Sequence, residues 1–151
     1  MCNISRASKF ARLSWNDRLL LIKTLLLVCA IRLSLWLIPF DRVRKMADRL
    51  AHGRRRIRHQ VSLEKIVRCV EVTATFVPAA TCLTQALTCQ ILLGRAGRRA
   101  ALKIGVCKAA VGGFKAHAWL ECDGKIVIGA IPTLNEYKPL PPIVSAAKAF
   151  L

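Results

Sequence analysis

The chain has 151 residues, of which 54% are apolar, which is enough for one domain with its own core and excludes a disordered protein. Lysine and arginine number 25 against 8 acidic residues, and the net charge of +17 attracts anionic partners over a long range. That charge does not distinguish a polyanion from an acidic peptide or an acidic protein surface.

The seven cysteines stand at positions 2, 29, 69, 82, 89, 107 and 122. Their number is odd, no C-x-x-C motif occurs, and no secretory leader is recognisable, which argues against a disulfide framework or a structural zinc site. We therefore expect reduced, mostly buried cysteines in a cytoplasmic protein that needs no metal and no cofactor.

A long helix is predicted from Ser14 to about Ile38, where Pro39 ends it. Ser14 and Asp17 resemble the start of a capping box. Because Lys23 and Arg32 interrupt its apolar run, we expect no membrane span. The helix is instead predicted to be buried, or to dock on a partner or on a membrane surface.

Asp41 is predicted to cap a second helix from Arg42 to about Ala51. The arginine-rich stretch 54–60 is then a linker, which completes a basic helical region over residues 1–60. This stretch contains no aromatic residue of the kind that a binder of single-stranded nucleic acid uses, so a solvated loop is the preferred interpretation.

Two further helices are predicted in the region 61–151. Ser62 caps the first, which carries apolar residues at helical spacing up to Val77. Thr81 caps the second, which runs from Cys82 to about Ala96.

The apolar period then changes to two, which predicts strands over residues 100–107, 114–122 and 125–131. Asp123-Gly124 is a strong signal for a two-residue hairpin turn between the last two strands. The proline-rich tail is expected to be extended. The fold class is therefore α+β, with a helical first half and then a helix packed on a small antiparallel sheet, within one compact domain.

Cys82 directly follows its predicted cap Thr81, so its thiol lies in the first turn of a helix, where free N–H groups and the helix dipole stabilise a thiolate. The same N–H groups stabilise an oxyanion in acyl transfer. Cys89, two turns further on, has neither advantage. Gln85, one turn after Cys82, could line a cleft or donate to the oxyanion, or simply pack at the helix edge.

A base for such a thiol has to come from elsewhere in the chain. His117 lies in an apolar strand two residues before Trp119, whereas His52 and His59 flank the arginine run. From the residues alone, a catalytic pair of Cys82 and His117 and two separate structural residues remain alternatives.

Four stretches carry a resemblance to a known family: "DRLLLIKTLLLVCAIRLSLWLIPFDRVRK", "ATCLTQALTCQILLGRAGRRAALKIGV", "GGFKAHAWLECDGKIVIG" and "LNEYKPL". They are similar to the lasso-peptide B2 proteins, which are bacterial leader peptidases. The resemblance implies a transglutaminase-like, papain-related fold, with the nucleophile on Cys82 and the base on His117.

The family is described with a Cys-His-Asp triad, and this chain departs from it at the third position. A two-residue turn places Gly129 and Ala130 opposite His117, and neither has a carboxylate. The candidate third members are Glu136, folding back from the tail, and Asp123 in the turn. Otherwise a backbone carbonyl or a water orients the imidazole.

The expected function is that of a cysteine peptidase that removes the leader from a ribosomally made lasso-peptide precursor. The resemblance implies as partners the precursor, a leader-binding B1 protein and a macrolactam synthetase; residues 1–60 do not resemble a leader-binding domain, and no nucleic acid is expected. The expected location is the cytoplasm, with attachment to a membrane surface left open. A transglutaminase-like acyl transferase and a basic nucleic-acid-binding protein without catalysis remain the alternatives.

Overall fold

The structure is a computed structural model, which describes residues 14–53, 61–109 and 112–141. Within these residues, four α-helices precede a four-stranded antiparallel sheet, so the predicted α+β class is confirmed. The helices are α2 (Trp15–Leu37), α3 (Phe40–Ala51), α4 (Leu63–Ala74) and α5 (Cys82–Arg95). The strands are β1 (Ala100–Lys108), β2 (Phe114–Cys122), β3 (Lys125–Ile128) and β4 (Lys138–Pro139).

Hydroxyl caps begin three of the helices, as the sequence predicts. The Ser14 hydroxyl accepts from the Asp17 backbone N–H at the start of α2, and the Ser62 hydroxyl accepts from the Lys65 backbone N–H at the start of α4. Thr81 Oγ1 accepts from the Thr84 N–H at the start of α5. Each cap satisfies an N–H group that the helix itself leaves without a partner.

The predicted start of α3 is wrong, because Asp41 does not cap it. The helix begins earlier, at Phe40, with Pro39 in the cap position and no side-chain capping bond. Proline has a fixed φ suited to a helix start and loses no hydrogen bond there. Asp41 lies in the first turn, where it pairs with Lys45 and Arg44.

The sheet has the strand order β3-β2-β1-β4. β1 and β2 pair along their full length, from Ala100 opposite Cys122 to Lys108 opposite Phe114. α4 is shorter than predicted, since it ends at Ala74 and a turn continues to Val77. The predicted linker 54–60, with its arginine run, lies outside the described residues.

The hairpin turn forms as predicted, with φ of 51° at Asp123 and 74° at Gly124. A bulge then shifts the register, so that Leu120 pairs with Ile128 and β3 ends there rather than at residue 131. Gly129 has φ of 84°, which turns the chain away from the strand. The expected strand pairing of His117 with Gly129 and Ala130 is therefore absent.

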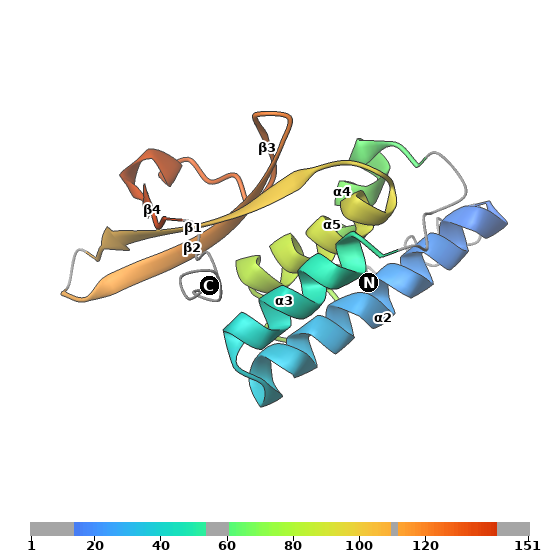
Figure 1. The fold of residues 1–151 in the computed structure, drawn as a ribbon, viewed down its shortest axis with the longest axis horizontal. Coiled ribbons are helices and arrows are strands. Elements are labelled where there is room, and N and C mark those ends of the chain that lie inside the picture. The colour runs from blue at the N-terminus through green and yellow to red at the C-terminus, as the bar shows by residue number, and fades with distance from the viewer. Residues whose placement is uncertain (1–13, 54–60, 110–111, 142–151) are drawn as a thin grey trace, which may run out of the picture.

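The tail is not simply extended, because it folds back along the sheet. A short 3₁₀-helix, η1 (Leu134–Glu136), leads into β4, which pairs with β1 at Gly105 and Val106. Figure 1 shows α2, α3 and α5 on one side of the β1–β2 ribbon and the segment of η1 and β4 on the other.

The core lies between the helices and the face of the sheet that packs on them. α5 is its central element, with fully buried side chains at Leu87, Cys89 and Ile91. Leu120 of β2 belongs to the same cluster as Cys89. This packing holds α5 rigidly, and therefore fixes the position of the residues at its first turn.

Candidate functional site

Cys82 is the first residue of α5 and is half-buried. Thr81 caps the helix twice: its hydroxyl accepts from the Thr84 N–H at 3.4 Å, and its carbonyl accepts from the Gln85 N–H at 3.1 Å. In the described part of the chain, no hydrogen bond is recorded for the N–H groups of Cys82 and Leu83. The first turn thus offers free donors beside the thiol, as the sequence predicts.

The other cysteine of α5 has the opposite environment. Cys89 is fully buried, and this burial, with smaller contributions from the charges of Cys122 and Glu71, raises the pKa of its thiol to about 12. Burial also raises the pKa values of Cys69 and Cys122. Thiols of this kind remain protonated near neutral pH and are poor nucleophiles.

His117 lies in the middle of β2, opposite Gly105 of β1, and is half-buried. Its Nε2 atom donates a hydrogen bond of 2.7 Å to the carbonyl oxygen of Gly129. Because a carbonyl oxygen only accepts, this bond assigns the proton of the neutral ring to Nε2. Nδ1 then carries the lone pair and is the atom available as a base.

Gly129 supplies the carbonyl that binds His117. The sequence predicts a backbone carbonyl as one way to orient the ring, but it does not say which one. The Gly129 φ of 84° is unfavourable for other residues, and an added Cβ would lie 2.7 Å from the Ala118 carbonyl oxygen and 2.9 Å from Trp119 Cα. The close approach to β2 therefore requires glycine. That approach is what brings the Gly129 carbonyl to His117.

Two aromatic rings surround the imidazole. The Trp119 ring is stacked at a centroid distance of 6.4 Å, and the Tyr137 ring lies at 5.7 Å in a tilted arrangement. Gly105 makes room for both, since a Cβ there would lie 2.9 Å from Trp119 and 3.0 Å from Tyr137. Tyr137 was not predicted as a site residue, although it lies within the "LNEYKPL" stretch.

The surroundings of Tyr137 also affect the pKa of its hydroxyl. Hydrogen bonding with Cys107 raises the pKa of the Tyr137 hydroxyl, and burial and the charges of Cys107, Glu136 and Cys82 raise it further. Of the two predicted catalytic residues, His117 is the one with a ring contact to Tyr137.

No hydrogen bond joins Cys82 directly to His117 in the described part of the structure. His117, Trp119 and Glu121 occupy one face of β2, whereas Leu120, on the alternate face, packs against α5. The structure therefore does not place the Cys82 thiol in hydrogen-bond contact with the His117 ring, and their pairing stays a prediction.

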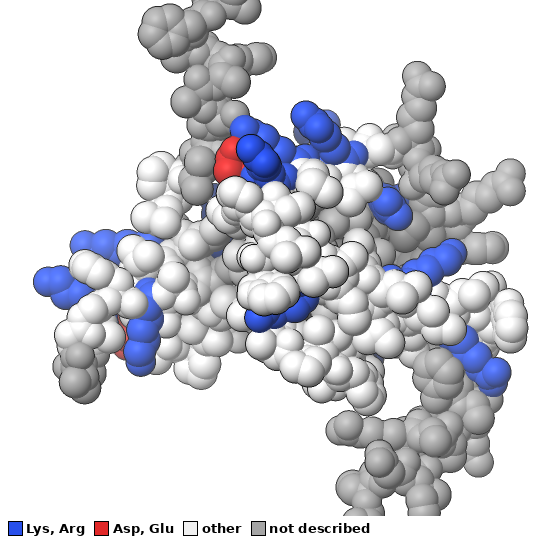
Figure 2. Space-filling model, turned by 90° about the horizontal axis from the view of Figure 1, so that it is seen from below, with Lys and Arg blue, Asp and Glu red and all other residues white. Residues whose placement is uncertain are grey.

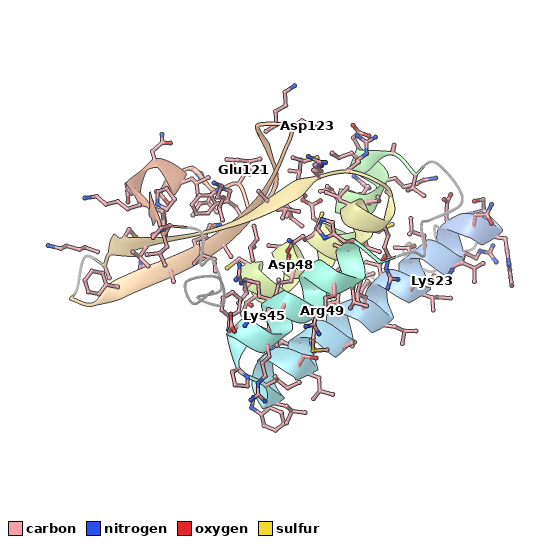
Figure 3. All side chains as sticks on the ribbon, viewed as in Figure 1. Lys23, Lys45, Asp48, Arg49, Glu121 and Asp123 are labelled. Atoms are coloured by element: carbon pink, nitrogen blue, oxygen red, sulfur yellow. The ribbon has the colours of Figure 1, made fainter. Side chains whose placement is uncertain are left out.

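In the described residues, no hydrogen bond is recorded between the imidazole and the candidate third members Asp123 and Glu136, or between it and the nearby Glu121. Asp123 is at the tip of the hairpin, with Oδ2 3.7 Å from the Cys122 thiol, and Figure 3 shows it there. Glu136 is exposed in η1, and Glu121 accepts a 2.9 Å hydrogen bond from Trp119 Nε1. The recorded partner of the His117 ring is the Gly129 carbonyl instead.

Gln85 is half-buried one turn after Cys82, and no side-chain hydrogen bond is recorded for it, so its predicted place in the cleft stays a prediction. Over the described ranges, no group of three His, Cys, Asp or Glu side chains is arranged to hold a metal ion. The arrangement as a whole offers a thiol at a helix N-terminus and a histidine with a fixed tautomer.

A family model described as "Transglutaminase-like superfamily" matches residues 25–141. The match begins within α2 and extends past β4, so it includes Cys82, His117 and Tyr137. No curated protein and no solved structure matches the chain.

Proposed function

Because the chain belongs to the transglutaminase-like superfamily, a group typical of cysteine peptidases and acyl transferases, we propose that it is a cysteine peptidase with Cys82 as nucleophile and His117 as base. We further propose that its substrate is a ribosomally made lasso-peptide precursor, cleaved between leader and core. The substrate assignment is supported by the resemblance of its four sequence stretches to the lasso-peptide B2 proteins.

The observation that carries this proposal is the hydrogen bond from His117 Nε2 to Gly129. It leaves Nδ1 as the basic atom and restrains the ring, which is the task of the orienting acid in a triad. A carbonyl provides the orientation without the negative charge of a carboxylate. The site therefore works as a dyad that the backbone supports.

In the first step, Nδ1 of His117 takes the proton from the Cys82 thiol, and the thiolate attacks the carbonyl carbon of the scissile bond. The resulting oxyanion accepts hydrogen bonds from the free N–H groups of the first turn of α5, with the Gln85 side chain as a further donor. The helix dipole stabilises both the thiolate and the oxyanion.

In the second step, the imidazolium gives its proton to the amine of the core peptide, which leaves. The leader then remains attached to Cys82 as a thioester. Water, deprotonated by the same Nδ1 atom, attacks the thioester carbonyl, and the leader is released with a free carboxylate while the thiol regains its proton. The freed core amine is the group that a macrolactam synthetase requires.

A separate leader-binding B1 protein is the partner that we propose for this reaction. Residues 14–53 form α2 and α3 and contain no strand that could pair with a leader. A bound partner would raise the local concentration of the scissile bond at Cys82.

The test is cleavage of the precursor by the purified full chain, followed by mass spectrometry of both products. We expect slow cleavage alone, faster cleavage with the B1 protein, and none with Cys82→Ala in either case. Cleavage at full speed without B1 would contradict the partner, and cleavage by the Cys82→Ala variant would contradict the nucleophile.

The acyl transferase remains the second candidate, because the family includes such enzymes and the dyad forms the same thioester in both reactions. Cleavage in H₂¹⁸O separates the two. A peptidase places one ¹⁸O atom in the new carboxylate of the leader, whereas a transferase attaches an added amine there instead.

A further inference from the structure

α2 presents a continuous apolar stripe to the outside of the protein. Its members follow each other at alternating spacings of four and three residues over six turns of the helix, which places them all on one face. Three of them are exposed to an extent typical of polar residues: Trp15 at 72%, Leu26 at 65% and Trp36 at 75%. The stripe consists of Trp15, Leu19, Ile22, Leu26, Cys29, Leu33 and Trp36.

The opposite face of α2 holds the helix to the protein. Thr24, Val28 and Ile31 are buried against the core, and Asp17 forms an ion pair of 2.6 Å with Lys65 of α4. By length and composition α2 could cross a membrane, and only 17% of its most apolar window is buried. Crossing would, however, expose that buried face and break these contacts, so the helix is suited to lie along a surface.

The exposed cations around the stripe are not balanced by free acids of the same two helices in the described residues. No exposed position of α2 carries an acid, and the nearby acids of α2 and α3 are engaged: Asp17 with Lys65, Asp41 with Lys45, and Asp48 with Gln90. By contrast, the described residues provide no ion pair for three cations of the same helices, Lys23, Arg42 and Arg49.

The figures show the same distribution. Lys23 lies on α2, and Lys45 and Arg49 lie on the neighbouring α3 (Figure 3). On the face of the molecule in Figure 2, uncharged side chains cover most of the described surface, lysine and arginine stand around them, and acids are scarce.

We propose that this stripe docks on the surface of an anionic lipid membrane. Tryptophan is enriched at the boundary between lipid and water, and Trp15 and Trp36 mark the two ends of the stripe. Unpaired cations beside an apolar face match negatively charged headgroups. A second copy of the chain is a poorer occupant, because two such faces would bring cations together with no acid between them.

The direct test is cosedimentation of the full chain with vesicles, together with tryptophan fluorescence. We expect binding to vesicles of phosphatidylcholine and phosphatidylglycerol at three to one, at least about tenfold weaker binding to phosphatidylcholine alone, and further weakening by salt. Emission from Trp15 and Trp36 should shift to shorter wavelength, whereas Trp119 is already buried and should not contribute.

Matched variants distinguish binding through the stripe from nonspecific binding through other exposed apolar side chains. Leu26→Gln with Trp36→Gln should weaken vesicle binding at least about tenfold without unfolding, because both side chains are already in water. Phe76→Gln with Phe114→Gln is the control, since these side chains are 59% and 76% exposed but lie off α2. Lys23→Gln should reduce the preference for the anionic vesicle, and Cys82→Ala should bind like the wild type.

Three results would overturn the inference. The first is no binding to either vesicle, and the second is equal loss of binding in the stripe and control variants. The third is self-association in sedimentation equilibrium that the stripe variant abolishes, because the stripe would then be an interface between two copies.

Discussion

Cys82 and Cys89 stand seven residues apart on the same helix, yet α5 gives them opposite chemistry. Cys82 lies at the capped first turn, half-buried, beside N–H groups without recorded partners. Cys89 lies among Ala86, Leu93 and Leu120 in the core, where burial raises the pKa of its thiol to about 12. Because the residue type is the same, the position along the helix accounts for the different burial of the two thiols, and Cys82 as the reacting thiol stays a prediction.

The buried middle of α5 anchors the helix to the rest of the protein. Residues in the middle of the helix fix it against the sheet, and this packing also fixes the position of Cys82 in its first turn. A nucleophile held by a packed helix needs little reorganisation during the reaction.

The largest effect is expected from replacing each of the two cysteines of α5 in turn. Cys82→Ala should reduce precursor cleavage at least about a thousandfold, because the nucleophile is lost. Cys89→Ser should keep most of the activity per folded molecule, although it destabilises the core by about 1–3 kcal/mol through burial of a hydroxyl. The measurement is the cleavage rate divided by the folded fraction, and equal losses in both variants would remove the distinction between the thiols.

The next effect concerns the orientation of His117. Gly129→Ala should lower turnover on the order of a hundredfold, because its Cβ would clash with β2 and move the carbonyl away from Nε2. Gly124→Ala is the matched control: its φ is also positive, at 74°, but an added Cβ would meet nothing within 4 Å. Similar turnover per folded molecule in the two variants would show that the Gly129 carbonyl has no part in orienting the ring.

The carboxylates near the site should matter less. We expect Asp123→Asn, Glu121→Gln and Glu136→Gln each to leave turnover within about tenfold of the wild type, whereas loss of a true orienting aspartate costs on the order of 10⁴ in a serine protease. A hundredfold drop with Glu136→Gln alone would instead make Glu136 the third member of a triad.

The smallest effect appears in the pH dependence of stability. The folded protein raises the pKa of Cys89 from 9.0 to about 12, so folding favours the neutral thiol. Its contribution is fully present below about pH 9 and is lost as the pH rises from there towards about 12. The free energy of unfolding, measured by chemical denaturation, should therefore fall less between pH 7 and pH 10 for Cys89→Ala than for the wild type. An identical fall in both proteins would contradict the burial of this thiol.

Much of the fold could be predicted because its determinants are local. The hydroxyl caps at Ser14, Ser62 and Thr81 start their helices within a few residues of where the sequence places them. The hairpin follows from Asp123-Gly124, whose residues both adopt positive φ. The prediction of Asp41 as a cap is wrong, because the sequence does not distinguish an acid in the first turn of a helix from an acid at its cap.

The details of the site depend on contacts that are distant in the chain. The register shifts between Leu120 and Glu121, so a simple two-residue hairpin predicts the wrong pairing, and Gly129 approaches β2 beyond that shift. Tyr137 reaches His117 because the tail pairs with β1 beside Gly105, a pairing with no local signal. The pairing of Cys82 with His117 therefore stays a prediction, and the sequence does not predict that Tyr137 lies beside His117.

The most direct test of the central claim is the position of the acyl-enzyme. Precursor and enzyme are mixed, the reaction is quenched in acid within seconds, and tandem mass spectrometry of the digested chain locates the leader. The account predicts a thioester on Cys82, none on Cys89, and none on either residue in His117→Gln within the same time. A leader attached to Cys89 or Cys107, or a wild-type amount of thioester in the His117→Gln variant, would contradict it.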